Sequence, residues 1–369
     1  MRVLYFSRDY TPHDYRFLSA LAETSHEVFY LRLEDKGLEL EQRRLPGAIE
    51  EIDWWSVSRP FIWQDLPWSL FFLRSLLDRL KPDLVHAGPV QNPAGLIAAV
   101  GYHPLVTMSW GSDLLVGADR SWGRTVAKNV LKRSDVVVCD CEAVRTRAEE
   151  LGMRSDRIVV FPWGVDLDKF SPGESEHLRQ DLGWQSNLVL ISNRSWEPLY
   201  GVDQVIEAFI RGSEILPQLR LILLGDGSQT EQIRGRIETA GLTDRVHIGG
   251  QVENDDLPEY YRAADLYVSA SHSDGSSVSL MEAMASGLPA LVSDIPGNRE
   301  WVAHGEHGWW FETGKPESLV DRLKQAVESE SDFDSLGERA RQRAAERANW
   351  QVNFQHLLEA YDLARAGKG

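Results

Sequence analysis

The stretch at residues 264–300 constrains the fold most, because it reads as one complete strand–loop–helix–strand unit. An apolar run at 266–270 predicts a short buried strand, and a polar, glycine-bearing turn at 271–277 follows it. Apolar residues then recur at helical spacing until Gly-Leu-Pro at 287–289 ends the helix. A second apolar run at 290–292 predicts the next strand. This alternation is typical of a parallel α/β sheet.

The same alternation runs through both halves of the chain. Strands are expected at 3–7, 27–33, 49–58, 83–87, 105–109, 136–139 and 158–161, and then at 188–192, 219–224, 246–248, 266–270, 290–292 and 309–311. Connections of helical length make these strands parallel, in doubly wound sheets. Proline and glycine interrupt the pattern at 162–172, which predicts a hinge. We therefore expect an α/β protein with an N-terminal domain at 1–165 and a C-terminal domain at 173–348. A terminal helix at 349–369 is expected to pack back on the N-terminal domain.

The loop–helix junction within 264–300 has the chemistry of an anion site. Backbone N–H groups at a helix start near Ser277 lack intrahelical partners and carry the positive end of the helix dipole, which suits a diphosphate. Asp274 precedes this helix, and Glu282 lies about one turn inside it. Asp274 can also be interpreted as a capping charge. The small residues around Glu282 indicate a tightly packed helix.

The stretch resembles the signature of the retaining glycosyltransferases of family 4, which have two Rossmann-like domains facing across a cleft, the GT-B fold. That signature is a Glu, seven residues, and a second Glu that opens E-A-M-A-x-G-x-P. Here Asp274 and seven further residues precede E-A-M-A-S-G-L-P at 282–289, so an Asp replaces the first Glu. The phrases P-W-G-V-D at 162–166, K-P-D-L-V-H at 81–86 and L-G-D-G at 224–227 resemble other motifs of the family.

The resemblance implies a cofactor-free enzyme of glycan or glycolipid biosynthesis. It would move a sugar from a nucleotide diphosphate to an acceptor hydroxyl and retain the anomeric configuration. The resemblance assigns Asp274 to the transferred sugar, as a catalytic residue, and Glu282 to the ribose. It places Arg194 on the diphosphate, where a planar guanidinium suits phosphate oxygens. Tyr200 stands near the place of an expected lysine, and ordinary packing also explains it. The other expected donor contacts are Gly225, Val252, Gly275, Ser276, Ser277, Val278 and Ser279.

The acceptor is expected on the N-terminal domain, where the chain departs from the family. R-D-Y-T-P at 8–12 replaces a Gly-Gly after the first strand, and Trp110 stands where many members have a His. His13, His86 and Trp110 are the acceptor-side candidates, although a structural role also explains either histidine. Asp113 is either a polar catalytic residue of the cleft or a helix cap.

Composition narrows the partners and the setting. A net charge of −17 disfavours nucleic acid and anionic membrane as bulk electrostatic partners. The only two cysteines, Cys139 and Cys141, are one residue apart in a strand-like run and cannot easily form a disulfide, which indicates a reducing, cytoplasmic setting. The D-L-D at 166–168 falls in the interdomain phrase and no His/Cys cluster occurs, so we predict no metal site. The apolar segment 63–77 predicts either a buried helix or an in-plane helix at the inner membrane face.

Two other functions fit this sequence. A GT-B nucleotide-sugar epimerase would convert its donor without an acceptor. A catalytically silent GT-B subunit, acting as a binding partner, agrees with the missing lysine, the missing Gly-Gly and Trp110. The sequence leaves open whether the donor is UDP-, GDP- or ADP-linked, and whether the acceptor is a glycan, a lipid-linked molecule or a small molecule.

Overall fold

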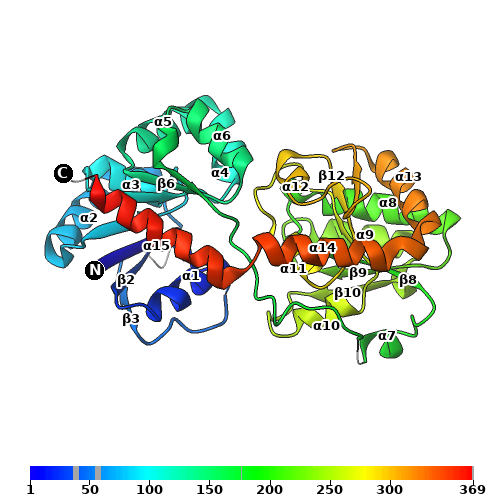
Figure 1. Ribbon diagram of the computed structural model, residues 1–369. Helices are drawn as coiled ribbons and strands as arrows, with labels where there is room; N and C mark the ends of the chain where they lie inside the picture. Colours follow the sequence, from blue (N-terminus) through cyan, green and yellow to red (C-terminus); the bar gives the residue numbers. More distant parts are fainter. Residues whose placement is uncertain (36–40, 55–59, 176, 368–369) are drawn as a thin grey trace. The chain divides into compact units, whose positions relative to one another are not determined.

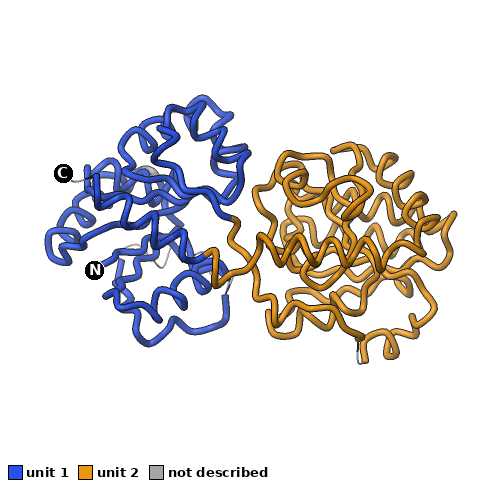
Figure 2. Tube along the Cα trace, viewed as in Figure 1, with its two compact units in different colours: residues 1–161, 354–369 blue, residues 162–353 orange. Residues whose placement is uncertain are grey.

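The computed structural model describes residues 1–35, 41–54, 60–175 and 177–367, which form an α/β protein of two compact units (Figure 1). Unit 1 comprises Met1–Phe161 and Phe354–Gly369, and unit 2 comprises Pro162–Asn353 (Figure 2). Each unit is built on one parallel sheet. The predicted pair of doubly wound, Rossmann-like sheets is therefore confirmed.

The sheet of unit 1 has the strand order β3-β2-β1-β4-β5-β6-β7, and all neighbouring strands are parallel. The strands are β1 Arg2–Ser7, β2 Glu27–Arg32, β3 Ile49–Ile52, β4 Leu84–Ala87, β5 Leu105–Met108, β6 Val136–Cys139 and β7 Ile158–Val160. The strand expected at 49–58 ends at Ile52 in the structure, and residues 55–59 lie outside the described part.

Helices cover both faces of this sheet. One face is covered by α2 (Leu66–Leu80), α3 (Pro93–Val100), α5 (Ser121–Arg133) and α6 (Glu142–Glu150), whose apolar side chains share one core with the strands. On the other face, Phe17 of α1 (Pro12–Ala22) and Tyr361 of α15 (Trp350–Ala366) contact His86 of β4. The last part of the chain therefore completes the core of unit 1.

Apolar spacing, with Phe17, Leu18 and Leu21 on one face, predicts a helix that starts at Arg16, but α1 begins four residues earlier, at Pro12. The cause is a capping box: the Thr11 hydroxyl accepts a bond from the Asp14 N–H, and the Asp14 carboxylate accepts one from the Thr11 N–H at 2.9 Å. Pro12 fits the first helical position because its missing N–H is not needed there. The T-P-H-D sequence was the signal for this start.

The sheet of unit 2 has the order β10-β9-β8-β11-β12-β13, again with parallel neighbours. Its strands are β8 Leu188–Asn193, β9 Leu219–Leu224, β10 Val246–Gly250, β11 Leu266–Ser269, β12 Ala290–Ser293 and β13 Gly308–Phe311. From β8 the order continues through β9 to β10 on one side, and from β11 it continues through β12 to β13 on the other. A parallel sheet opens a crevice at the carboxyl ends of its strands where the order reverses in this way. In unit 2 this point lies between β8 and β11.

The helices of unit 2 also lie on both faces of their sheet. They are α7 Leu178–Asp181, α8 Val202–Ile215, α9 Thr230–Thr239, α10 Leu257–Arg262, α11 Val278–Ala285, α12 Pro296–Arg299, α13 Pro316–Glu328 and α14 Phe333–Arg347. Residues 279–285 of α11 are all buried, and α11 contacts α14. The small residues beside Glu282 therefore belong to a tightly packed helix, as predicted. Within the described ranges, no helix is both long and apolar enough to cross a membrane.

Candidate functional site

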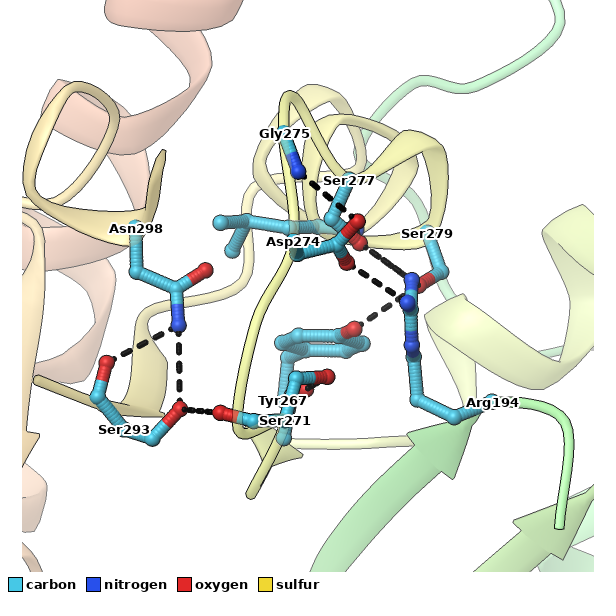
Figure 3. A network of polar contacts seen from close by, with 11 residues as sticks. Arg194, Tyr267, Ser271, Asp274, Gly275, Ser277, Ser279, Ser293 and Asn298 are labelled. Atoms are coloured by element: carbon cyan, nitrogen blue, oxygen red, sulfur yellow. Dashed lines mark hydrogen bonds and ion pairs between the residues drawn. The ribbon is translucent and has the colours of Figure 1, made fainter. Parts of the chain in front are cut away.

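Two segments of unit 2 meet where its strand order reverses. Arg194 directly follows β8, and residues 270–277 lead from β11 into α11. Because β8 and β11 are neighbours in the sheet, the Arg194 side chain reaches the loop that carries Asp274 (Figure 3). The structure therefore brings together residues that are 80 positions apart in sequence.

Arg194 is the centre of a polar network (Figure 3). Its Nη2 donates to Asp274 Oδ2 at 2.5 Å, and its Nη1 donates to Ser277 Oγ at 2.6 Å and to Ser279 Oγ at 3.2 Å. Only 10% of the Arg194 side chain is exposed. Burial, the largest single influence, lowers the pKa of this guanidinium, but the Asp274 carboxylate and the nearby tyrosines together raise the pKa overall. The site therefore holds a permanent, largely buried positive charge.

Two tyrosines surround this guanidinium. The Tyr200 ring centroid lies 4.3 Å from Arg194 Cζ, which is cation–π geometry. Burial raises the pKa of the Tyr200 phenol, so the ring is neutral at physiological pH. Tyr267, in β11, shares a 2.8 Å hydrogen bond with Ser279 Oγ. Tyr200 thus contacts the predicted diphosphate-binding arginine through its ring face. Tyr267 is hydrogen-bonded to Ser279, which is itself a partner of Arg194.

Helix α11 is capped by Ser277. The Ser277 hydroxyl accepts from the Leu280 N–H, and the Asp274 Oδ1 accepts from the Gly275 N–H at 3.0 Å. Asp274 therefore bonds within its own loop and to Arg194, while the serine provides the helix cap. This arrangement argues against the interpretation of Asp274 as a capping charge.

Glu282 lies in the second turn of α11 and is 4% exposed. The Tyr261 hydroxyl donates to Glu282 Oε2 at 2.9 Å, and Asn193 Nδ2 donates to the Tyr261 hydroxyl at 3.1 Å. The carboxylate is thus connected to the end of β8 through Tyr261. An ionised carboxylate accepts several hydrogen bonds at once, so this group can hold Tyr261 and also receive ligand hydroxyls.

The loop backbone is fixed by close contact with α12. A Cβ atom at Gly297 would lie 2.3 Å from the Gly275 carbonyl oxygen and 2.6 Å from that of Asp274. Any larger residue at 297 would therefore push the loop away from its place. Sequence periodicity does not reveal this contact, because the two segments come together only through the β11–β12 pairing.

Polar side chains from the next strand and helix also support the loop. Ser293 Oγ donates to the Ser271 carbonyl at 2.5 Å, and Asn298 Nδ2 donates to the Ser293 carbonyl at 2.9 Å (Figure 3). Trp301 Nε1 donates to Ser276 Oγ at 3.2 Å. None of Ser293, Asn298 and Trp301 was predicted from the sequence. Their positions after a predicted strand were the only available signal.

Gly225 and Val252 follow the neighbouring strands β9 and β10. Gly225 has φ +106°, and a Cβ there would lie 2.3 Å from the Arg194 carbonyl oxygen. This glycine therefore allows the β9 loop to approach the Arg194 backbone. Its N–H donates to the Gly250 carbonyl at 2.6 Å, which ties the β9 and β10 ends together two residues before Val252.

The candidates in unit 1 fall into two groups. His13, near the start of α1, and Trp110, after β5, contact each other edge to face with ring centroids 5.1 Å apart. His86 is 1% exposed, its Nδ1 lies 2.7 Å from the Tyr361 hydroxyl, and burial lowers its pKa to about 3. A neutral imidazole enclosed in this way fits the structural interpretation of His86.

Asp113 links two loops of unit 1. Its carboxylate accepts one hydroxyl and three backbone donors: Ser109 Oγ at 2.6 Å and the N–H groups of Val90, Trp110 and Leu114 at 2.9, 3.1 and 3.0 Å. Burial raises its pKa, although these hydrogen bonds act in the opposite direction. Asp113 lies inside the short helix α4 (Ser112–Leu115), whose N-cap is Gly111, so it does not cap that helix. A carboxylate with both oxygens bound to the protein favours a structural role over the catalytic one.

The residues of the D-L-D phrase are engaged locally. Asp166 Oδ1 accepts the N–H groups of Asp168 and Lys169 at 3.0 and 3.1 Å. In the part of the chain that the structure describes, no group of three or more His, Cys, Asp or Glu side chains is placed to hold a metal ion.

Two family models match this chain. Residues 174–343 match the model described as glycosyl transferases group 1, and residues 13–169 match glycosyltransferase family 4. Mannosylfructose-phosphate synthase of Agrobacterium fabrum is 28% identical over 221 residues, which are 57% of this chain and 48% of that protein. N-acetyl-alpha-D-glucosaminyl L-malate synthase of Bacillus anthracis is 26% identical over 269 residues, which are 72% of this chain and 69% of that protein. The alignment thus spans about half of the first relative and two thirds of the second.

Solved structures share the fold. Anabaena HepE, crystallised with UDP-glucose, aligns with a TM-score of 0.81 at 22% identity and covers 98% of this chain and 99% of its own. Sucrose-phosphate synthase from Thermosynechococcus elongatus aligns with a TM-score of 0.83 at 17% identity over 100% of both chains.

Proposed function

We propose that this chain transfers a sugar from a nucleotide diphosphate to an acceptor hydroxyl with retention of configuration. The basis is that the chain belongs to the group 1 glycosyltransferases of family 4. The observation that supports this most is the position of Arg194. Its charged, largely buried guanidinium lies beside the start of α11, at the point where the strand order reverses. A helix start and an arginine together form a strong anion site.

The proposed mechanism assigns one task to each part of the unit 2 site. The diphosphate lies on Arg194 and the N-terminus of α11, and the ribose hydroxyls donate to Glu282. The base lies near Val252, and Asp274 contacts the transferred sugar. As the bond to the sugar breaks, negative charge develops on the leaving diphosphate. The fixed positive charge of Arg194 and the helix N–H groups stabilise that charge, which lowers the barrier without a metal.

For the donor and the acceptor we propose only a chemical class. HepE was crystallised with UDP-glucose, which supports a UDP-sugar as the first donor to test here. On the acceptor side we keep His13 and Trp110 as candidates, because hydrogen bonds between loops and core contacts already explain Asp113 and His86. A glycan, lipid-linked or small-molecule acceptor would each present the required hydroxyl.

The first test measures binding and hydrolysis of the donor. UDP at about 100 times its Kd is expected to stabilise the protein by about 2.7 kcal/mol, and GDP and ADP by less at the same concentration. Slow hydrolysis of UDP-glucose is expected to continue in EDTA, because Arg194 and α11 take the place of a metal. Activity that EDTA abolishes and magnesium restores would contradict metal independence. Conversion to another UDP-sugar without acceptor would favour the epimerase, and no binding with no hydrolysis would favour the silent subunit.

We also propose that unit 1 contacts an anionic membrane surface through α2. One side of this helix is buried by Leu73, Leu76, Leu77 and Leu80, which agrees with the buried-helix interpretation. The other side exposes Trp68 (63%), Phe71 (66%) and Phe72 (43%). Exposed aromatic residues on an amphipathic helix are typical of binding in the plane of a membrane. The side chain of Trp63, the first residue of the predicted segment, lies outside the described part.

Charge near α2 is more balanced than in the chain as a whole. The cations Arg74, Arg79 and Lys81 lie in or beside α2, together with the carboxylates Asp65, Asp78 and Asp83. The whole chain has 39 cations and 56 carboxylates. The α2 surface therefore repels anionic headgroups less than the average surface of this chain would. Cys139 and Cys141 are buried and are not joined in a disulfide, which agrees with the proposed cytoplasmic setting.

Vesicle binding tests this surface. The double substitution Trp68→Ser/Phe71→Ser is expected to reduce co-sedimentation with phosphatidylglycerol vesicles by about tenfold or more. The reason is that it removes two large aromatic side chains that would be buried in the membrane on binding. Trp122→Ser, at another exposed aromatic of unit 1, is the matched control and should bind as the parent does. If the double variant instead converts a dimer to a monomer in light scattering, the face is an interface between copies and the membrane proposal is wrong.

A further inference from the structure

The anion site proposed for unit 2 contains an anionic side chain of the protein itself. Arg194 Nη2 donates to the Asp274 carboxylate at 2.5 Å, while Nη1 is shared by Ser277 and Ser279. Carboxylate and phosphate oxygens accept from a guanidinium in the same way. Asp274 therefore occupies the position on Arg194 that a donor phosphate oxygen would need.

The Asp274 carboxylate and an oxygen of the donor diphosphate cannot both occupy this position on Arg194 Nη2. A diphosphate oxygen bound to Arg194 Nη2 would lie within a few ångströms of the Asp274 carboxylate, and two like charges at that distance in a largely buried site repel strongly. The Asp274 side chain is 18% exposed and Arg194 10%, so water screens the repulsion only partly. Binding of a diphosphate consequently requires Asp274 to release Arg194.

The structure shows which part can move. The backbone of the loop is held, because Gly297 lies directly against the Asp274 and Gly275 carbonyl groups. The Asp274 side chain accepts from Arg194 Nη2 and from the Gly275 N–H. Rotation of this side chain about its own bonds would give up the ion pair without displacing the loop. Arg194 would stay in place, since Ser277, Ser279 and the Tyr200 ring hold it independently.

We infer that Asp274 is an internal substitute for a donor phosphate, and that the diphosphate displaces it from Arg194 and so makes its carboxylate available to the sugar. The inference rests on the proposed function and deepens it. It makes Asp274 accept a sugar hydroxyl only when a diphosphate is bound. A free sugar would meet a site in which Asp274 is still paired with Arg194, so the device selects sugars that carry a nucleotide diphosphate.

Calorimetry with Asp274→Asn tests the exchange. Asparagine has the same shape but no charge to compete for Arg194. UDP and inorganic pyrophosphate are therefore both expected to bind this variant more tightly than the parent, by about tenfold, while hydrolysis of UDP-glucose falls. Asp274→Glu keeps the charge and should leave pyrophosphate affinity near that of the parent. Asp294→Asn, which breaks the exposed ion pair with Arg299 in the same unit, controls for net charge and should change neither.

Each outcome decides the inference. Unchanged or weaker pyrophosphate binding by a folded Asp274→Asn variant would overturn it, and so would equal tightening by Asp294→Asn. Because pyrophosphate carries neither sugar nor base, this result is independent of turnover. Tighter pyrophosphate binding in a protein that hydrolyses no sugar nucleotide would leave the exchange standing and count against the proposed function. If Asp274→Asn melts at a much lower temperature than the parent, the other two variants are compared instead. Asp274→Glu and Asp294→Asn must each still bind pyrophosphate with the parent's affinity in the same titration.

Discussion

Arg194→Ala is expected to weaken UDP binding by about 100-fold or more and to abolish measurable donor hydrolysis. Hydrogen bonds to charged groups contribute about 1.5–3 kcal/mol each, and the guanidinium offers two N–H groups at the site. The N-terminus of α11 remains in this variant, so some phosphate affinity should persist. Arg194→Lys keeps the charge but loses the planar fork that reaches Asp274 and Ser277 together, and it should lie between the alanine variant and the parent.

Stability must be separated from binding in this experiment. Alanine at 194 removes the partner of Asp274, a mostly buried carboxylate, and breaking such a pair from one side is destabilising. The double variant Arg194→Ala/Asp274→Asn removes both charges. It should recover part of the lost melting temperature but none of the lost UDP affinity. An Arg194→Ala protein that still binds UDP nearly as well as the parent would show that Arg194 serves the fold alone.

Most of the fold could be predicted because apolar runs typical of buried strands alternate along the chain with apolar residues at helical spacing. Runs such as 188–191 and 221–224 are apolar throughout, as is typical of strands covered on both faces, and the segments between the strands repeat at helical spacing. The start of α1 was missed because Thr11 and Asp14 act through hydrogen bonds, to which apolar spacing is insensitive. One side of helix α2 is buried, as the buried-helix interpretation predicts, and the other exposes aromatic residues; in-plane membrane contact stays a prediction.

The sequence singles out the candidate site residues one by one, but it does not predict how they are arranged. A motif places Asp274 and Glu282 on one loop and helix, and a neighbouring pattern singles out Arg194. That Arg194 pairs with Asp274 depends on β8 lying beside β11, which is a property of strand order. The same holds for Tyr261, which contacts Glu282 from another helix. Contacts between elements distant in sequence leave no local pattern to read.

Glu282→Gln is expected to weaken UDP binding by about 10- to 100-fold, which corresponds to the loss of one charge-assisted hydrogen bond, while pyrophosphate binding stays unchanged. The difference follows from the proposed contact, because UDP has a ribose and pyrophosphate has none. The amide of glutamine keeps one acceptor oxygen and replaces the other with a donor, so two ribose hydroxyls can no longer both donate to it. The size and burial of the side chain hardly change.

Tyr261→Phe distinguishes ribose binding from a structural role of Glu282. This variant removes the hydroxyl that donates to Glu282 Oε2 at 2.9 Å but leaves the carboxylate charged in its turn of α11. If Glu282 holds the ribose, Tyr261→Phe should retain most of the UDP affinity. It should also retain the preference for UDP over 2′-deoxy-UDP or 3′-deoxy-UDP, whichever hydroxyl the carboxylate contacts. Glu282→Gln should lose that preference. If instead both variants weaken UDP and pyrophosphate equally, Glu282 acts only through the position of α11, and the ribose assignment is wrong.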